Sequence, residues 1–266
     1  MNHGLKGEPA AQARLQAVAV VPALNEQLRV GRTVAALARA GVDSVIVVDD
    51  GSSDSTGQVA SDAGAIVVRR GRTGGKGAAI IDGLARARGR GTGSARGRGT
   101  GSARGRGTGS ARGMDMIAAG GCVVLADGDL GDSAEEMAKV MALVASGLAD
   151  MAVAGFPAAL GSGFGLAVGL ARAGIRGLCK VELRWPLSGQ RAVRADLLLG
   201  MLDAGPRSER GFGFEVGLTI DWLRAGHSLI EVPTCMTHRA TGRDIAGFAH
   251  RGRQFAAVAR ALAARL

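Results

Sequence analysis

Apolar residues along this chain gather into short continuous runs, separated by longer segments that have one apolar face. The runs cover residues 17–21, 44–48, 65–69, 121–126, 150–154 and 228–232. Segments of helical spacing cover residues 27–39, 54–63, 80–88, 133–146 and 215–224. Strands that are apolar throughout, rather than alternating, are typical of parallel sheets covered by helices on both faces. The pattern predicts an α/β fold with a mostly parallel central sheet flanked by helices.

Polar or charged residues lie shortly beyond the end of each early run. Glu26 lies beyond the first run, Asp50 beyond the second, and Lys76 opens the helix after the third; the fourth run ends on residues 127–129, Asp-Gly-Asp. In such sheets ligands bind at the carboxyl ends of the strands. Two carboxylates on one turn suit Mg²⁺ or Mn²⁺ carrying a phosphorylated substrate. Each residue also has a plain structural reading, such as a solvated first-turn lysine for Lys76 or a helix cap for Asp54.

The glycines do not form either of the common phosphate-binding motifs. A P-loop that used Gly75-Lys76 would need glycine where Arg70 stands and serine or threonine where Gly77 stands. The dinucleotide motif Gly-x-Gly-x-x-Gly is absent after the first run, where residues 22–26 read Pro-Ala-Leu-Asn-Glu. A P-loop NTPase and a dehydrogenase are therefore disfavoured.

The net charge of +10 comes largely from one low-complexity segment. Residues 88–113 contain three copies of Arg-Gly-Arg-Gly-Thr-Gly-Ser-Ala and then Arg-Gly, with seven arginines and no acidic residue; without them the net charge is +3. Arg/Gly tracts can bind nucleic acid through phosphates and stacking, but this one has no aromatic residue to stack on bases. We expect a disordered insert and no nucleic-acid partner.

Cysteine usage and hydropathy indicate a cytoplasmic protein. The cysteines, Cys122, Cys179 and Cys235, are odd in number and far apart, which favours reduced thiols over a disulfide framework. No signal segment is expected at the N-terminus. Residues 151–171 lack charge but are rich in Ala and Gly and contain a proline, so a buried strand, a loop and a helix start are expected there.

The last segment, residues 248–266, is basic and amphipathic, with Phe255, Val258 and Leu262 expected on one side. It could dock on the rest of the chain, form a homodimer, or make peripheral contact with anionic lipid. Docking or dimerisation is the favoured interpretation.

The early motifs, residues 20–26 (VVPALNE), 45–56 (VIVVDDGSSDST), 75–77 (GKG) and 127–129 (DGD), resemble the nucleotide-sugar half of a family 2-like glycosyltransferase with the GT-A (Rossmann-like) fold. The resemblance covers roughly residues 17–155. It implies that Mg²⁺ or Mn²⁺ is held by Asp129 with Asp127. It also implies that a nucleotide is bound by Pro22, Ala23, Leu24, Glu26, Asp50, Lys76, Asp127 and Gly128. Gly128 departs from the alanine or serine usual in that motif.

Residues 186–192 (PLSGQRA) and 211–216 (GFGFEV) resemble the acceptor side of the same enzymes, closest in pattern to glucosyl-3-phosphoglycerate synthases and their relatives. The resemblance implies that Glu215 and Asp129 are catalytic, with Glu215 orienting an acceptor hydroxyl or serving as base, and that His238 completes the metal site. It places Gly189, Gln190, Arg191 and Arg239 at the acceptor. Glu215 could instead only stabilise a helix N-terminus, and His238 could be a surface histidine.

Residues 155–170 lack the Arg-Val-Thr-like loop of the synthases, so the acceptor is not specified. We predict an N-terminal tail (1–16), a glycosyltransferase domain (17–247) with an insert at 89–113, and a C-terminal amphipathic helix (248–266). The expected activity transfers a sugar from UDP- or GDP-sugar to a small-molecule or lipid-phosphate acceptor. The synthase resemblance favours retention, whereas a lone base at the acceptor would favour inversion. The alternatives are a sugar-1-phosphate nucleotidyltransferase, which should carry a Gly-rich turn at residues 22–26, and a non-catalytic protein that binds through the basic tract.

Overall fold

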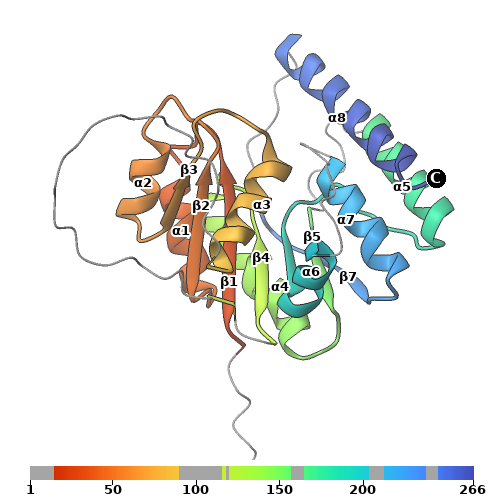
Figure 1. Ribbon diagram of the computed structural model, residues 1–266, viewed down its shortest axis with the longest axis horizontal. Helices are drawn as coiled ribbons and strands as arrows, with labels where there is room; N and C mark the ends of the chain where they lie inside the picture. Colours follow the sequence, from red (N-terminus) through yellow and green to blue (C-terminus); the bar gives the residue numbers. More distant parts are fainter. Residues whose placement is uncertain (1–14, 90–115, 118–119, 157–164, 204–212, 238–244) are drawn as a thin grey trace, which may run out of the picture.

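The computed structural model describes residues 15–89, 116–117, 120–156, 165–203, 213–237 and 245–266. Its strands are β1 (Ala17–Ala23), β2 (Ser44–Asp49), β3 (Ile66–Arg69), β4 (Cys122–Leu125), β5 (Met151–Gly155), β6 (Arg191–Arg194) and β7 (Leu229–Pro233). Its helices are α1 (Val30–Arg39), α2 (Thr56–Asp62), α3 (Lys76–Ala87), η1 (Gly131–Glu136), α4 (Met137–Ala145), α5 (Gly165–Cys179), α6 (Ala195–Asp203), α7 (Gly213–Arg224) and α8 (Ile245–Ala263). Figure 1 shows the sheet between layers of helices, as the apolar pattern predicts.

The seven strands form one sheet in the order β3-β2-β1-β4-β6-β5-β7. All neighbouring strands are parallel except at β6, which runs antiparallel to both β4 and β5. The mostly parallel sheet is therefore confirmed, and β6 is a strand that the apolar pattern did not reveal. Because β6 is reversed, its first residue, Arg191, pairs with Leu125 at the end of β4. The segment that precedes β6 thus enters the edge where β1, β2 and β4 end.

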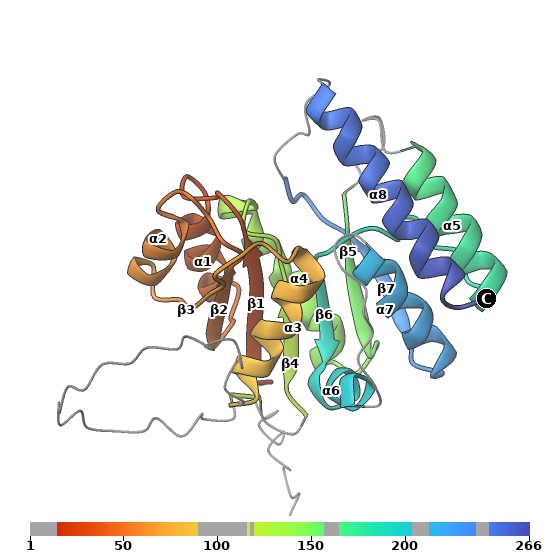
Figure 2. The ribbon, with the colours of Figure 1, turned by 45° about the horizontal axis from the view of Figure 1, so that its top comes forward.

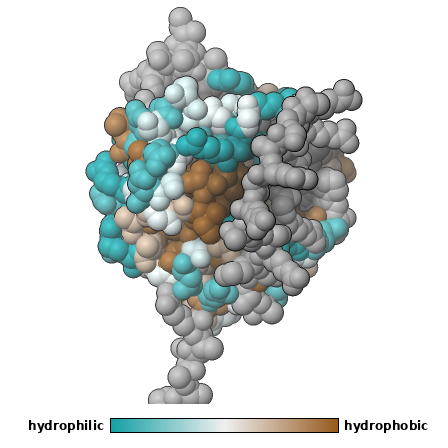
Figure 3. Space-filling model, turned by 60° about the vertical axis from the view of Figure 1, so that its left-hand side comes forward, coloured by the Kyte–Doolittle hydropathy of each residue, from teal (hydrophilic) through white to brown (hydrophobic). Residues whose placement is uncertain are grey.

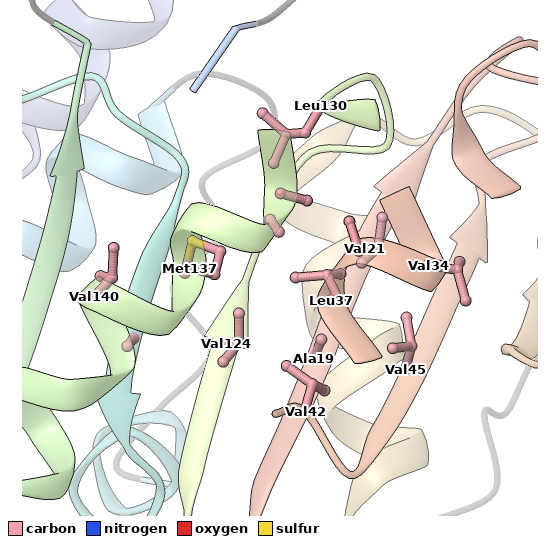
Figure 4. Close-up of a cluster of buried hydrophobic side chains, with 14 of the residues drawn as sticks. Ala19, Val21, Val34, Leu37, Val42, Val45, Val124, Leu130, Met137 and Val140 are labelled. Carbon is pink, nitrogen blue, oxygen red and sulfur yellow. The ribbon is translucent and has the colours of Figure 1, made fainter. Parts of the chain in front are cut away.

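Alternate residues of the buried strands face two separate cores. Ala19 and Val21 of β1 pack with Val34 and Leu37 of α1 on one face, together with Met137 and other residues of α4 (Figure 4). Val18 and Val20 point to the opposite face and pack with α3, α6 and α7. Strands buried on both faces need no alternation of polar and apolar positions. This explains why the sequence shows continuous apolar runs.

Helices α5, α7 and α8 form a further helical group beside the sheet (Figure 2). Val258, Ala261 and Leu262 of α8 are buried against α5 and α7, and Gly174 of α5 provides the space that the Leu262 side chain occupies. The predicted C-terminal helix therefore docks on its own chain. Phe255, expected on the same side of the helix as Val258 and Leu262, is 42% exposed, because the contact face runs through other positions of α8.

The ends of the connection from α3 to β4 are held together. The backbone N–H of Met116 donates to the carbonyl of Ala87 at 2.9 Å, and Ile117 is buried in the core beneath α3. Arg88 pairs with Asp203 of α6 at 2.6 Å. The Arg/Gly repeat between these anchors lies outside the described residues, apart from its first two positions.

No described helix is long and apolar enough to cross a membrane. Residues 151–156 form β5 and its end, and α5 begins at Gly165, as expected for the uncharged stretch; its middle lies outside the described ranges. Figure 3 brings the left-hand side of Figure 1 forward and shows a hydrophobic area bordered by hydrophilic residues. The edge strand β3 keeps Ile66, Val67 and Val68 half-buried.

Candidate active site at the carboxyl edge of the sheet

The Asp-Gly-Asp turn after β4 is held by a buried threonine of α1. Thr33 is fully buried; its hydroxyl donates to the carbonyl of Gly128 at 3.0 Å and accepts from the N–H of Gly131 at 2.8 Å. A methyl group on Gly128 would lie 3.0 Å from the Cβ of Ala23 at the end of β1. The turn is therefore packed closely against β1, which favours glycine at this position.

Lys76 links the Asp-Gly-Asp turn to the second half of the chain. It is the first residue of α3, and its Nζ lies 2.6 Å from Oδ1 of Asp127 and 2.9 Å from Oε1 of Glu215. Burial alone would lower the pKa of Lys76, but attraction to the two carboxylates outweighs it and raises the pKa above its ordinary value. A lysine at a helix N-terminus is unfavourable for the helix dipole, so its carboxylate partners account for its position. Lys76 is therefore a bridge between charges and not a solvated side chain.

The segment before β6 supplies the second donor to Asp127. Gln190 is 3% exposed, and its Nε2 donates to Oδ2 of Asp127 at 2.7 Å. The hydroxyl of Ser188 donates to Oε1 of Gln190 at 3.3 Å, which fixes the orientation of the amide. Gly189 leaves room for the bridge, because a Cβ there would lie 2.2 Å from Nζ of Lys76. Both oxygens of Asp127 thus accept bonds from within the protein.

Arg191 differs from the acceptor contact predicted for it, because its guanidinium lies inside the protein. The residue is 1% exposed, and it donates to the carbonyl of Ser188 at 2.9 Å and to the hydroxyl of Thr219 at 2.8 Å. Burial lowers its pKa to about 10, against the attraction of nearby glutamates. Arg191 therefore supports the turn that carries Gly189 and Gln190 instead of facing a ligand.

Asp50 organises the loop between β3 and α3. It is 4% exposed, and its carboxylate accepts from the N–H groups of Gly74 at 2.9 Å and Gly75 at 2.8 Å and from the guanidinium of Arg70. Gly75 has a φ of 86°, which favours glycine, just before Lys76 begins α3. The carboxylate therefore sets the direction in which α3 starts, and with it the position of the lysine bridge.

The loops after β1 and β2 are hydrogen-bonded to each other beside Asp50. The N–H of Glu26 donates to the hydroxyl of Thr56 at 2.7 Å, and the side-chain oxygen of Asn25 accepts from the N–H of Ser53 at 2.9 Å. Asp54 accepts from the N–H of Thr56 at 2.9 Å, close to its predicted capping role, although the cap position itself is Ser55.

The strand-end residues predicted for the nucleotide share this edge. Pro22 and Ala23 pair in register with Val48 and Asp49 of β2, and Leu24 is 42% exposed.

The Asp-Gly-Asp turn fits a hard divalent cation in part. Asp127 and Asp129 supply carboxylate oxygens of the kind that Mg²⁺ and Mn²⁺ prefer, but Asp127 is already engaged by Lys76 and Gln190. Within the described ranges, no three His, Cys, Asp or Glu side chains are grouped as a metal site. The predicted third ligand, His238, and the predicted acceptor residue Arg239 lie outside those ranges. The turn thus offers two carboxylates, and the assignment of the cation to Asp129 stays a prediction from the resemblance.

The structure brings most of the predicted residues to one edge of the sheet. Glu215 is 4% exposed at the start of α7 and faces Lys76. Sequence reasoning missed Thr33 and Arg70, which hold the Asp-Gly-Asp turn and the loop before α3. Thr33 carried a usable signal, because it is a polar residue on the apolar face formed by Val30, Val34 and Leu37.

Comparison with known proteins agrees with this geometry. Residues 18–91 match the family described as Glycosyl transferase family 2. A segment of 65 residues, 24% of this chain, is 42% identical to the uncharacterized protein MJ1222 of Methanocaldococcus jannaschii, and covers only 27% of that relative.

Solved structures of glucosyl-3-phosphoglycerate synthase from Mycobacterium tuberculosis match nearly the whole chain. The complex with Mn²⁺ and UDP-glucose has a TM-score of 0.65 and 25% identity, over 96% of this chain and 80% of that one. The complex with phosphoglyceric acid has a TM-score of 0.65 and 23% identity, over 96% and 82%. Residues 18–91 are thus similar to the family 2 glycosyltransferases, and the chain has the GT-A fold of glucosyl-3-phosphoglycerate synthase.

Proposed function

We propose that this chain is a metal-dependent glycosyltransferase that moves a sugar from a nucleoside-diphosphate sugar, UDP- or GDP-linked, to an acceptor hydroxyl. The observation that carries the proposal is the lysine bridge, in which Lys76 joins Asp127 of the Asp-Gly-Asp turn to Glu215 of the second half. This bridge lies at the edge of the sheet where ligands bind in open α/β folds. The family 2 segment and the synthase fold support the same activity.

The nucleotide would lie across the ends of β1, β2 and β4. Pro22, Ala23, Leu24 and Glu26 would line its base and ribose. A carboxylate can accept about four hydrogen bonds, and Asp50 already accepts three within the protein, so it retains room for one from the ligand. We assign Gly128 and Asp127 to the ribose side of the turn.

In the reaction, the acceptor oxygen forms a bond to the anomeric carbon while the bond to the nucleoside diphosphate breaks, and the hydroxyl proton passes to the leaving diphosphate. A divalent cation on Asp129, with Asp127 and His238 in support, would neutralise the charge of the leaving diphosphate. Lys76 adds a positive charge on the same side. Glu215 is buried against Lys76, so we assign it to holding the lysine in place as the acceptor hydroxyl approaches.

The acceptor side would be formed by Gly189 and Gln190, with Arg239 beside them. Arg191 would act through this turn and not by contact. We propose a small-molecule or lipid-phosphate acceptor and a cytoplasmic location. The odd number and wide spacing of the cysteines support this location.

Calorimetry with UDP, in the presence and absence of Mn²⁺ or Mg²⁺, tests the donor site. We expect metal-dependent binding that Asp129→Ala abolishes and that Asp132→Ala leaves unchanged, because the Asp132 side chain is 63% exposed and pairs with surface arginines. If Asp129→Ala binds UDP with unchanged metal dependence, the metal assignment is wrong.

A panel of nucleotide sugars, tested against phosphoglycerate, polyprenyl phosphate and simple sugars, tests the reaction itself. Transfer to any acceptor, or hydrolysis of one donor, supports the proposal. Release of pyrophosphate from a nucleoside triphosphate and a sugar 1-phosphate would instead identify a nucleotidyltransferase.

A further inference from the structure

A basic groove lies on α5 and the segment that follows this helix. It is an open groove of about 1100 Å³, lined by Arg172, Arg176 and Lys180, by Arg184 from the segment after the helix, and by one acidic residue among the described ones, Glu182. We propose that this groove binds a ligand carrying one or more phosphate groups. The proposal goes beyond the glycosyltransferase activity and does not depend on it.

The helix aligns two of the cations, and a third follows its end. Arg172 and Arg176 are four residues apart, so they lie on one side of α5 and are offset by about 6 Å along it, at about 1.5 Å per residue. Lys180, with a φ of 60°, is the first residue after Cys179, where the helix ends. Several cations around one groove suit a ligand with several anionic oxygens.

Most of this positive charge is not neutralised within the protein. Arg176 lies 3.3 Å from Glu182, an exposed pair that contributes little. Across the described part of the chain, Arg172, Lys180 and Arg184 form no ion pair, and their side chains contact a backbone carbonyl or a ring instead. Cations near a helix C-terminus can serve the helix dipole. That explanation covers Arg176 and Lys180 but not Arg172, two turns from the helix end, or Arg184 beyond it.

The wall opposite the helix is fixed in position. The carboxylate of Glu231 on β7 accepts from the N–H groups of Arg184 at 2.7 Å and Trp185 at 2.6 Å. The Trp185 ring packs on Gly155, where no side chain could fit, and the Arg184 guanidinium carbon lies 5.4 Å from the ring centroid. Arg172 donates to the carbonyl of Arg184 and so joins the two walls. A preorganised concave site favours a discrete phosphate ligand.

Calorimetry with inorganic pyrophosphate, in buffer with EDTA, tests the groove. We expect Arg172→Ala/Lys180→Ala to weaken binding about tenfold, equivalent to about 1.4 kcal/mol. The matched control Arg32→Ala/Lys139→Ala removes the same charge from exposed positions on α1 and α4 and should bind like the unaltered chain. Salt should weaken the binding, because the Debye length falls from about 10 Å at 0.1 M to about 3 Å at 1 M.

A second arm asks whether the phosphate belongs to a lipid. Vesicles of phosphatidylcholine with and without phosphatidic acid are sedimented with the same three proteins. Pyrophosphate binding that needs the groove residues identifies a free phosphate ligand, and vesicle binding with the same requirement identifies a headgroup. If the groove variant and the control behave alike in both arms, the groove is not a phosphate site. Thermal unfolding of both variants confirms that they are folded.

Discussion

Replacing Lys76 by methionine tests whether the lysine bridge joins the two halves of the site. The substitution keeps the length of the side chain but leaves the buried Glu215 without its cation. Removing one partner of a buried ion pair costs about 3–5 kcal/mol. Because the side chains of Lys76 and Asp127 are 21% and 31% exposed, solvent screening reduces this, and we expect the free energy of unfolding to fall by about 2–4 kcal/mol.

Urea denaturation measures the loss, and UDP calorimetry with Mn²⁺ measures the effect on the site. The double variant Lys76→Met/Glu215→Gln removes both buried charges, so it should regain about 1–2 kcal/mol of stability without regaining UDP affinity. Lys139→Met, on a pair whose lysine side chain is 57% exposed, serves as the control and should change stability little. If Lys76→Met matches this control, or if the double variant recovers nothing, the bridge does not stabilise the protein in the way we infer.

Three further predictions follow from the site and the core. Thr33→Val should lower the free energy of unfolding by about 1–3 kcal/mol, because it leaves the carbonyl of Gly128 and the N–H of Gly131 without their hydrogen-bond partner. It should also weaken metal-dependent UDP binding, and Thr33→Ser should restore both. Gly189→Ala should displace the bridging ammonium and lower UDP affinity, whereas Gly200→Ala, with open space at its Cβ, should not; equal affinities would refute the contact. Burial raises the pKa of the Cys122 thiol to about 12, so a thiol reagent at pH 8 should label exposed Cys235 first. Because the unfolded thiol ionises near its ordinary pKa of about 9 and the folded one does not, this group's contribution to stability should decline as pH rises from 9 towards 12.

The sequence predicted the early half of the fold well, because its strands are apolar throughout and its turns are polar. The ends of β1, β2 and β4 fall close to where the runs stop. β6 was missed because its four residues, Arg191–Arg194, begin and end with arginine. No local pattern shows that the first of these arginines is buried, since its partners lie on distant segments.

The residues of the candidate site could be predicted from the sequence better than the contacts between them. Strand ends identified Asp50 and Asp127, and family resemblance added Glu215. The pairing of Lys76 with two carboxylates could not be predicted, since it depends on how α3 and α7 approach each other in space. The buried support given by Thr33 and Arg191 follows from tertiary packing as well.

The closure of the chain between Ala87 and Met116 has a consequence for the history of this gene. Helix α3 begins with Lys76 at the carboxyl edge of the sheet and ends at the opposite edge. There the backbone hydrogen bond from Met116 to Ala87 closes the connection. For the disordered insert that the sequence predicts, the entropy cost of closing the loop grows only with the logarithm of its length, so gaining or losing one eight-residue unit should alter stability by about 0.2 kcal/mol. The number of repeat copies can thus change with almost no effect on stability, at a place far from the proposed site. A chain that lacks residues 90–113 should therefore bind UDP as the full chain does.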